Sequence, residues 1–600
     1  MTADANPLQG SLFGDLQVSD ESQNSPKGPE IFNKDFNEEA LAEDALIRPR
    51  KRNADTNLRK SRPNSEKSRL SIASEELPNW HHHSLIDLEL LTPVLRHYVE
   101  LKAKNPDRVL LYRLGDFFEC FFEDAITLSR LLELTLTSKE GGKNVGKVPM
   151  AGIPHHSVER YCAELINKGL SVALCDQLES SPSKGTLIKR EITRILTPGT
   201  VIEEGMLQAR RNNWLSAVVI NNLDNEDEIE WGLANADVST GELLITQSKN
   251  LEFLSQELSK IQPSEIVWEG INSNYAKKFF PNQSHIKEIP SIYFNEYEAQ
   301  SAIKKHYKIN TIDGLGLNDY QLGLKAAGGI LGYLSTTKEI NIEAKDNDER
   351  SHVLLEYPQI IIPGNSLLID SQTRKNLELT STQKDNQFHG SLLWSIDRTL
   401  TAMGGRSLRR WVEAPLLDAD EIRARQLVIS RLVKNRKLRQ EIRKMLRSMG
   451  DLERLAGRAG AGQAGGRDLI AIADGLERLP KLSNQIKQIK EDAPSWFQSL
   501  ININPNLIEI ASTIKYNLID NPPLSITEGG LIYDGVDKVL DGLRNQLDDQ
   551  DMWIKSQELK ERKESGNNNL RIQYHRTFGY FLAVSKAKSN LVPNHWIRRQ

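Results

Sequence analysis

The segment 114–119, LGDFFE, places an aromatic ring and a carboxylate where both could face a ligand. Gly115 permits a tight exit from a preceding strand, and Asp116 with Glu119 matches the D-x-x-E capping box that begins a helix. On that predicted helix Phe117 lies off the centre of the apolar stripe, and Glu119 points well away from the stripe. The stripe comprises Phe118, Phe121, Phe122, Ala125 and Leu132. The alternative is purely structural: Phe117 packs near the first turn, and Glu119 ties down the helix start.

Two adjacent histidines, His155 and His156, end the loop 150–156, MAGIPHH. Adjacent side chains seldom converge on one ion, and no carboxylate or thiol partner is placed with them, so the pattern does not indicate a metal site. Taken alone, both histidines suit surface or capping positions.

A nearby glycine-lysine run, 141–148 (GGKNVGKV), reproduces the spacing of a Walker A phosphate-binding loop up to its final residue. Val148 stands where a Ser or Thr hydroxyl would bind magnesium, and Pro149 follows where a helix should begin. We therefore interpret the run as a flexible loop and reject it as a nucleotide site.

Asp237 ends a predicted strand, a position similar to that of the carboxylates in RNase H-like nucleases. A two-metal nuclease needs several convergent carboxylates, and only Asp237 sits convincingly on a strand. We expect this part of the chain to be catalytically silent.

Basic side chains gather near the C-terminal end of the sequence, on two predicted strands, 570–574 (LRIQY) and 578–585 (FGYFLAVS). Because strand side chains alternate between faces, one face of the first strand carries Arg571, Gln573 and His575. Further cations follow at the turn and the strand exit, at Arg576, Lys586 and Lys588. A solvated basic face is the ordinary explanation of such a hairpin.

The elements that position these residues change in type along the chain. Strands and helices alternate over 92–200, with a strand at 108–114, a helix at 116–132, a helix at 158–168 that Ser157 can cap, and a strand at 170–175. Strand-like runs return at 214–248, joined by short turns, and become helical towards 339. From 366 to 514 the chain is overwhelmingly helical, with a long amphipathic stretch at 419–449, and a further helix covers 536–564.

Bulk composition excludes several classes of protein. The 600 residues are 38% hydrophobic and 26% charged, a composition typical of a globular protein that is too long for one core. No apolar stretch is long enough to cross a bilayer, and the first residues lack the features of a secretory signal, so we expect a cytoplasmic protein. The net charge of -4 is uninformative about nucleic acid, because binding depends only on local positive potential.

Several runs together resemble the MutS family of DNA mismatch-recognition proteins. They are YRLGDFFECFFEDA, VPMAGIPHHSVERYCAELINKGLSVALCDQ, RILTPGT and, near the end, NNLRIQYHRTFGYFLAVSKAKSNLVPNHWIRRQ. The resemblance covers almost everything from about 81 to 600, in the family's domain order. It implies a multidomain α/β plus all-α fold: an α/β mismatch-binding domain, an RNase H-like connector, a long helical core/lever domain and the start of a β-rich clamp.

The resemblance also implies roles for particular residues. Phe117 would wedge into the minor groove and stack on a mispaired base, while Glu119 would form a hydrogen bond with that base. His155 and His156 would contact the DNA backbone. The clamp would hold the backbone without sequence preference through Arg571, His575, Arg576, Lys586 and Lys588. An aromatic wedge unstacks and kinks the duplex, which is least costly where pairing is already faulty.

From these patterns we expect five regions along the chain. They are a disordered tail at 1–84, the mismatch-binding domain at 85–205, the connector at 206–350, the core/lever at 351–535, and the lever end with a partial clamp at 536–600. We also expect the chain to stop short of the ATPase domain, so that no catalytic residue, cofactor-binding residue or metal ligand is predicted within it.

By resemblance the complete protein is a dimeric, DNA-dependent ATPase that uses ATP and Mg²⁺ at sites outside these residues. Its partners would be double-stranded DNA with mismatches or small insertion/deletion loops, a second copy of itself and a MutL-type repair protein. Two alternatives remain open. One is a MutS-like module that binds other DNA structures without a repair ATPase; the other is an RNase H-like nuclease, which metal-dependent cleavage lost on Asp237→Asn would support.

Overall fold

The structure is a computed structural model of the whole chain. It describes residues 81–142, 145–177, 189–221, 229–269, 280, 285–337, 354–489, 497, 500–575, 579–585, 592–593 and 596–597. The expected tail, apart from 81–84, therefore lies outside the described residues. Among the residues that are described, no helix combines the length and the apolar composition needed to span a bilayer.

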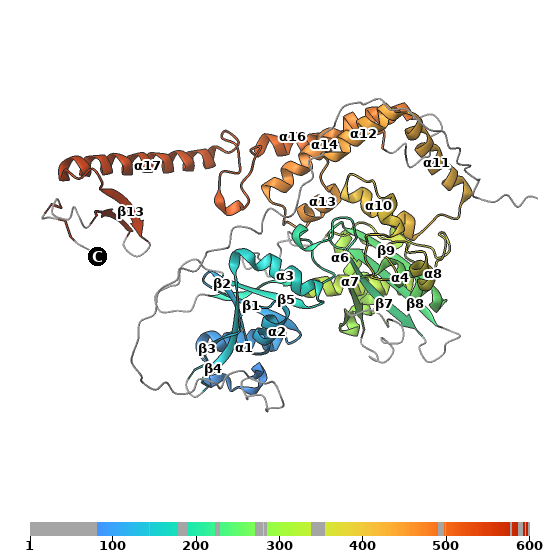
Figure 1. Cartoon of the computed structure of the whole chain (residues 1–600), viewed down its shortest axis with the longest axis horizontal. Helices are drawn as coiled ribbons and strands as arrows, with labels where there is room; N and C mark the ends of the chain where they lie inside the picture. The colour runs from blue at the N-terminus through green and yellow to red at the C-terminus, as the bar shows by residue number, and fades with distance from the viewer. Residues whose placement is uncertain are drawn as a thin grey trace, which may run out of the picture. The chain divides into compact units, whose positions relative to one another are not determined.

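The first folded region is a six-stranded sheet with helices on both faces, drawn in blue and cyan in Figure 1. Its order is β3-β4-β2-β1-β5-β6, and only β1 and β5 pair in parallel. The strands are β1 (Arg108–Leu114), β2 (Phe117–Phe121), β3 (Thr137–Glu140), β4 (Lys147–Pro154), β5 (Ser171–Gln177) and β6 (Arg190–Leu196).

Apolar side chains on the two faces of this sheet form two separate cores. Helix α1 (Pro93–Lys104) contributes Leu95 and Tyr98 to one core. Helices α2 (Phe122–Leu131) and α3 (Val158–Asn167) contribute Leu128 and Leu165 to the other. Strand side chains alternate between faces, so β1, β2, β4, β5 and β6 each supply both cores, whereas the edge strand β3 is mostly exposed. The α/β prediction for this region is confirmed.

One predicted element of this region is wrong. The helix expected at 116–132 begins only at Phe122, and residues Phe117–Phe121 form strand β2. The capping box is therefore absent, since Asp116 and Glu119 do not begin a helix. The reason is a two-residue hairpin turn: Leu114 pairs with Phe117, and only Gly115, with φ 65°, and Asp116 lie between them. A glycine at the first turn position with positive φ is the pattern of a tight type II′ hairpin.

The helix expected at 158–168 begins and ends where predicted, but without the side-chain cap that Ser157 was expected to supply. Helix α3 begins after Ser157, but the Ser157 side chain forms no capping hydrogen bond. At the other end, Gly169 adopts φ 82° and donates its N–H to the Ile166 carbonyl. A positive φ after the last helical residue is the usual reason for glycine there.

The second sheet has the order β11-β10-β7-β8-β9-β12. Strands β7 (Trp214–Asn221), β8 (Glu230–Asp237) and β9 (Glu242–Ser248) are antiparallel, while β10 (Glu265–Trp268) and β11 (Ile286–Glu288) continue in parallel from β7. Short β12 (Gln359–Ile360) pairs in parallel with β9. This order agrees with the RNase H-like connector that the resemblance implies.

Helices cover both faces of the second sheet. Helix α4 (Leu251–Ile261) packs in one core, and α6 (Glu296–Tyr307) with α7 (Gln321–Thr336) packs in the other. Helix α7 approaches α6 closely at Gly328, where a Cβ would lie 2.3 Å from the Ala299 side chain. Alanine at 328 would therefore push the two helices apart.

The third region is helical, as predicted. Its helices are α8 (Ser371–Asn376), α9 (Leu392–Ile396), α10 (Ala402–Glu413), α11 (Ala419–Lys434), α12 (Arg436–Arg447), α13 (Leu452–Gly460), α14 (Gly466–Ile486) and α16 (Pro505–Asn517). The long stretch expected at 419–449 breaks in two at Asn435, whose side chain accepts the N–H of Leu438 and so begins α12. Asparagine favours such caps over helix interiors.

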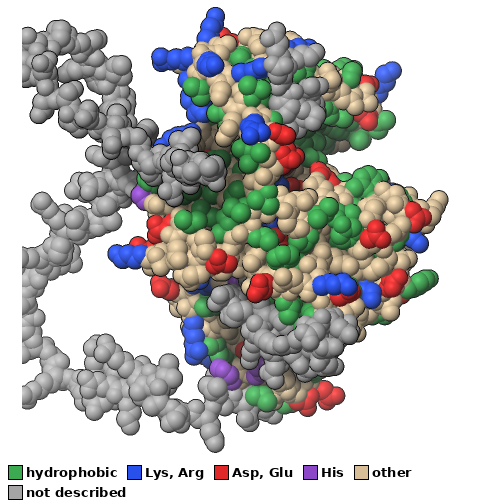
Figure 2. Space-filling view, turned by 90° about the vertical axis from the view of Figure 1, so that its right-hand side faces the viewer, with side chains coloured by type: hydrophobic (Ala, Val, Ile, Leu, Met, Phe, Trp, Pro, Cys, Tyr) green, Lys and Arg blue, Asp and Glu red, His purple; other side chains and the backbone are tan. Residues whose placement is uncertain are grey.

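Basic side chains are concentrated on α12. Figure 2 shows Lys and Arg side chains in blue at the top of the view, over helices of this region. Exposed cations on α12 are Arg436, Lys437, Arg443, Lys444 and Arg447. A solvated face is the ordinary role of such charges, and we assign them no ligand.

The last described elements are one long helix and a hairpin. Helix α17 (Lys538–Ser565) ends at Gly566, which has φ 65°, and strands β13 (Arg571–His575) and β14 (Gly579–Ala583) pair antiparallel. The hairpin is joined to the helix because Arg562 Nε donates to the Leu570 carbonyl at 2.7 Å and Ile572 N–H donates to Glu558 Oε2 at 2.8 Å. The helix and both strands confirm the sequence prediction to within about two residues at each end.

The reactivity of three buried cysteines can be used to test the packing of the first region. Cys120, Cys162 and Cys175 are free and buried, and burial raises the pKa of Cys162 and of Cys175 to about 12. The pKa of Cys120 is raised too, chiefly by burial. At pH 8 the reactive thiolate of Cys162 and of Cys175 is therefore about a thousandfold scarcer than that of a free cysteine.

We expect no cysteine to react with a thiol-specific chromogenic disulfide at pH 8 in the native protein within minutes. All three thiols should react promptly after unfolding in guanidinium, which serves as the control. Rapid reaction of one thiol in the native state would show that its surroundings in this region are open to solvent.

Candidate nucleic-acid interface

Phe117 and Glu119 lie two positions apart on β2, so both side chains project from the same face of the sheet. Sequence reasoning expected that both side chains could face a ligand, and alternation along a strand, rather than a helix, puts them on one face. Phe117 is 47% exposed, whereas Phe118 between them is 2% exposed in the opposite core. Phe117 is therefore accessible to a ligand, whereas Phe118 is not.

The rest of this face is covered, and the end that carries Phe117 is not. Farther along β2, Phe121 projects from the same face as Phe117 but is fully buried beneath α1 with Tyr98. Opposite Phe117 and Glu119, strand β4 presents Pro154 and Gly152. A Cβ at Gly152 would lie 3.8 Å from both Phe117 and Glu119, so glycine leaves the space beside both side chains open.

The carboxylate of Glu119 has a charged partner that sequence reasoning missed. Lys139 Nζ on β3 lies 2.6 Å from Glu119 Oε2, with β4 between their two strands. The Glu119 side chain is 17% exposed and that of Lys139 is 38% exposed. The available signal was the short run TSKE ahead of the rejected glycine-lysine loop, which could form an edge strand beside the motif.

The histidine loop lies beside the same end of the sheet. His155 N–H donates to the Asp116 carbonyl at 2.8 Å, and its ring stacks on Phe118 with centroids 5.8 Å apart. His155 and His156 are both exposed on the turn that follows β4. The structure therefore brings the predicted residues Phe117, His155 and His156 to the same end of the β2–β4 pair, with the His155 ring on the Phe118 face and Phe117 and Glu119 on the other.

The predicted backbone contacts of the hairpin are placed only in part. Arg571 is exposed on β13, and His575 ends that strand opposite Gly579. Arg576, Lys586 and Lys588 lie outside the described residues. Tyr574 and Tyr580 are 65% and 64% exposed, and their rings lie 5.2 Å apart across the hairpin.

The glycine-lysine loop connects two antiparallel strands. It joins β3 to β4, and Glu140 pairs with Lys147 across it. A Walker A loop leads from a strand into a helix, and Lys147 instead opens a strand, so this geometry agrees with its rejection as a nucleotide site.

Asp237 is held by structural hydrogen bonds. It is fully buried, and Oδ1 accepts from the N–H and hydroxyl of Ser239 at 3.0 and 2.6 Å. Oδ2 accepts from Asn212 Nδ2 at 2.8 Å and from the N–H of Asn213 at 3.1 Å. Both oxygens are therefore used to close the β8–β9 turn and to fix the segment before β7.

One group within the described residues could offer three metal-ligand atoms, from His82, His83 and Glu123. The group already forms a mutual contact, because His83 Nδ1 lies 2.6 Å from Glu123 Oε1, and His83 N–H donates to Glu123 Oε2 at 3.0 Å. The ammonium of Lys102 lies 3.9 Å from the same carboxylate. A neighbouring cation opposes a metal ion, so we interpret this group as a packing contact of residue 83 with α2.

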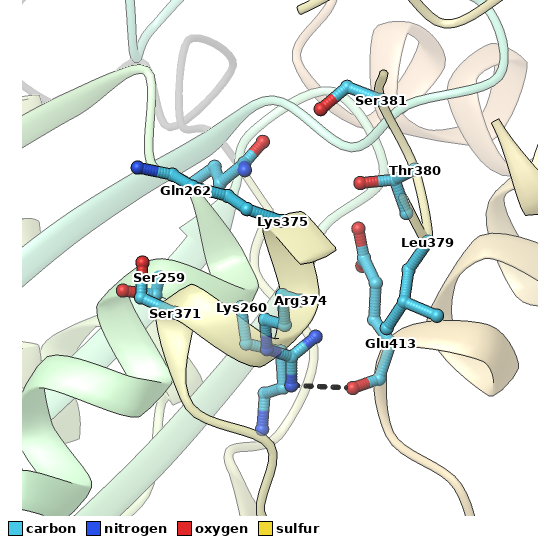
Figure 3. A pocket seen from close by; sticks show the side chains of 10 residues that line it. All are labelled: Ser259, Lys260, Gln262, Ser371, Arg374, Lys375, Leu379, Thr380, Ser381 and Glu413. Atoms are coloured by element: carbon cyan, nitrogen blue, oxygen red, sulfur yellow. Dashed lines mark hydrogen bonds between the residues drawn. The ribbon is translucent and has the colours of Figure 1, made fainter. Parts of the chain in front are cut away.

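A small pocket lies between α4 and the helical region, and Figure 3 shows the ten side chains that line it. Arg374 Nη2 donates to the Glu413 carbonyl at 2.7 Å, and Lys260 Nζ donates to Glu257 Oε1 at 2.6 Å. Burial raises the pKa of the Glu413 carboxyl, although Arg409 beside it favours its charged form. The charged groups here stabilise one another, and we assign the pocket no ligand.

Three family models match this chain in sequence order. MutS domain I matches residues 92–205, MutS domain II matches 213–344 and MutS domain III matches 372–587. The α/β domain, the connector and the helical region with its hairpin therefore define a protein with MutS domains I to III.

Whole-chain comparisons agree with this class. The chain is 56% identical over 606 residues to a protein of Prochlorococcus marinus (strain MIT 9303) named DNA mismatch repair protein MutS. A protein of the same name from Parasynechococcus marenigrum (strain WH8102) is 56% identical over 594 residues. These alignments cover 100% and 99% of this chain, and 65% and 64% of the two relatives. The chain belongs to the MutS family, and it spans about two thirds of the length of these relatives.

Proposed function

We propose that this chain recognises base-base mismatches and small insertion/deletion loops in duplex DNA and thereby initiates DNA mismatch repair. The observation that supports this most directly is the half-exposed Phe117 beside the Glu119 carboxylate, at the one end of this strand face that is not covered. The ring is the part that enters the minor groove, and the carboxylate accepts a hydrogen bond from the displaced base. We propose no catalytic residue within this chain.

In this proposal, mismatched and matched duplexes are distinguished by how easily the DNA is deformed, not by its base sequence. Inserting a ring between base steps costs a few kcal/mol of unstacking, and a mispaired step is already poorly stacked. The carboxylate adds selectivity because it repels phosphates and gains a hydrogen bond only where a base edge is free to meet it. The exposed position of Phe117 at the start of β2 suits this role.

Contacts to the DNA backbone supply affinity. We assign them to His155 and His156, at the same end of the β2–β4 pair as Phe117, and to Arg571, His575, Arg576, Lys586 and Lys588 near the end of the sequence. Each phosphate that an Arg or Lys neutralises steepens the salt dependence of binding by about one unit of log-log slope.

The complete protein is proposed to act as a homodimer that binds ATP with Mg²⁺ and recruits a MutL-type partner. We assign no residue of this chain to ATP or Mg²⁺. The proposed location is the cytoplasm, on the nucleoid when the protein is bound to DNA.

The test is a titration of the complete protein against three duplexes of otherwise identical sequence: matched, G·T and with one unpaired nucleotide. We expect the two lesions to bind about tenfold more tightly or better, since a saving of about 1.4 kcal/mol in deformation gives tenfold in Kd. Equal Kd values for all three duplexes at two salt concentrations would contradict mismatch recognition and favour a general DNA-structure binder.

A further inference from the structure

The ammonium group of Lys139 reaches the Glu119 carboxylate across an intervening strand. Strand β3 lies at the edge of the sheet and β2 lies two strands inward, yet Lys139 Nζ is 2.6 Å from Glu119 Oε2. On its way the Lys139 side chain passes the ring of Phe121, whose centroid lies 5.4 Å from Nζ. The aromatic face favours the cation and so helps to hold the lysine in this direction.

Strand β4 lies between β3 and β2, and its residues opposite Glu119 and Lys139 are Gly152 and Val148. Even a Cβ at Gly152 would make only ordinary van der Waals contact with Glu119 and Phe117, at 3.8 Å, so β4 does not crowd the carboxylate. The ion pair therefore depends on three strands and not on a local sequence pattern.

Charge makes the pair relevant to DNA. A carboxylate at a surface that meets phosphates repels every duplex, matched or mismatched, and an adjacent ammonium offsets that repulsion. The same ammonium competes with a base edge for the carboxylate oxygen. A residue in this position controls both the cost of bringing Glu119 to DNA and the freedom of Glu119 to bind a base.

We propose that Lys139 is a specificity-determining positioning residue: it holds the Glu119 carboxylate beside Phe117 and balances its charge, and so sets the ratio between mismatched and matched binding. This inference rests on the proposed function. Lys139 acts through Glu119 and is not itself a base contact.

The experiment is a double-mutant cycle on the complete protein with Lys139→Met, Glu119→Gln and the combined variant. Dissociation constants are measured by fluorescence anisotropy for a G·T duplex and its matched counterpart. With Glu119 present, Lys139→Met should weaken matched binding about tenfold and G·T binding about threefold, because the freed carboxylate still gains its base contact. In the Glu119→Gln background, Lys139→Met should change either Kd less than about twofold, since coupled pairs lose their effect when one partner is gone.

A matched control is Lys147→Met, on the neighbouring strand β4, where Lys147 is exposed. It should change matched and G·T binding by equal factors in both backgrounds. If Lys139→Met also weakens both duplexes equally in both backgrounds, Lys139 is a plain phosphate contact and the proposal is wrong.

Two further measurements keep the outcomes distinct. Lys139→Arg retains the charge and should keep the mismatch ratio within about twofold of wild type; a ratio shifted as far as that of Lys139→Met would overturn the charge-balancing role. Phe117→Ala in the same assay tests the proposed function itself. Loss of mismatch preference in Phe117→Ala without coupling between Lys139 and Glu119 would reject only this inference, whereas unchanged preference in Phe117→Ala would reject the function.

Discussion

Replacing Phe117 by alanine should abolish the preference for a G·T mismatch while leaving weak, salt-sensitive binding to any duplex. Stacking of a base on an aromatic ring contributes about 1–3 kcal/mol, which corresponds to roughly 5- to 150-fold in Kd. The Phe117 ring is 47% exposed, so its removal leaves little cavity and should cost little stability. Gel-shift titrations of matched and G·T duplexes at two salt concentrations measure the ratio directly.

The chain offers a matched control for this change in Phe388, which is 42% exposed in the helical region. Phe388→Ala removes a ring of similar exposure and should leave the G·T to matched ratio unchanged. Thermal unfolding of both variants should stay close to wild type. A G·T preference that survives in Phe117→Ala would defeat the assignment of the ring as the wedge.

Replacing Arg406 by methionine should destabilise the helical region by about 3 kcal/mol, as expected when one partner of a buried ion pair is removed. Arg406 on α10 is fully buried, with two bonds of 2.7 Å to Asp451 and two, of 2.5 and 3.2 Å, to Glu453. A fifth bond, of 2.9 Å, reaches the Ala209 carbonyl. Burial opposes the charge of Arg406, but the bonds to both carboxylates outweigh it and raise the pKa of the guanidinium.

Limited proteolysis and urea unfolding of the variant are the measurements. The control is Arg423→Met, because the Arg423 side chain is 74% exposed and pairs with Asp420, one turn away and 92% exposed. Exposed pairs of this kind contribute at most about 0.5 kcal/mol. Arg406→Lys should fall between the two, since an ammonium cannot form the bidentate contact with Asp451. An Arg406→Met protein as stable as Arg423→Met would show that α10 and the start of α13 are held by apolar packing instead.

Alternation and periodicity predicted most of the fold, because they report burial directly. Runs such as 108–114 and 214–221 are apolar on both faces, and they form interior strands. The helix at 538–565 and the hairpin after it also lie where the sequence placed them. Each of these elements could be predicted from local sequence alone, because a pattern of apolar side chains defines its length and a nearby turn or glycine residue marks its end.

The stretch 116–121 could not be assigned from periodicity alone. Phe118, Phe121 and Phe122 are spaced as on a helix, and the same spacing lets a short strand lead directly into a helix. The two-residue turn at Gly115 and Asp116 decides between them, because it returns the chain along β1 and supplies hydrogen bonds on that side. A glycine-aspartate pair between two apolar runs was the signal that favoured a hairpin.

The partner of Glu119 was beyond sequence reasoning for a different reason. Lys139 is 20 residues away in the chain, on a strand that does not touch β2, and only the sheet order brings the two charges together. The exposure of Phe117 could be predicted from the residues next to it in the sequence. An ion pair that crosses a sheet can be predicted only once the order of the strands is known.

Strand β2 is an interior strand, and at Phe117 it is flanked on both sides, by Leu114 of β1 and by Pro154 of β4. A ring mounted in this way brings no loop that must be ordered on binding, and ordering costs about 1–2 kcal/mol for each residue. The conformational cost on the protein side is then small and the same for every lesion. Differences in affinity among lesions should therefore follow the stiffness of the DNA step, and rank with its ease of bending.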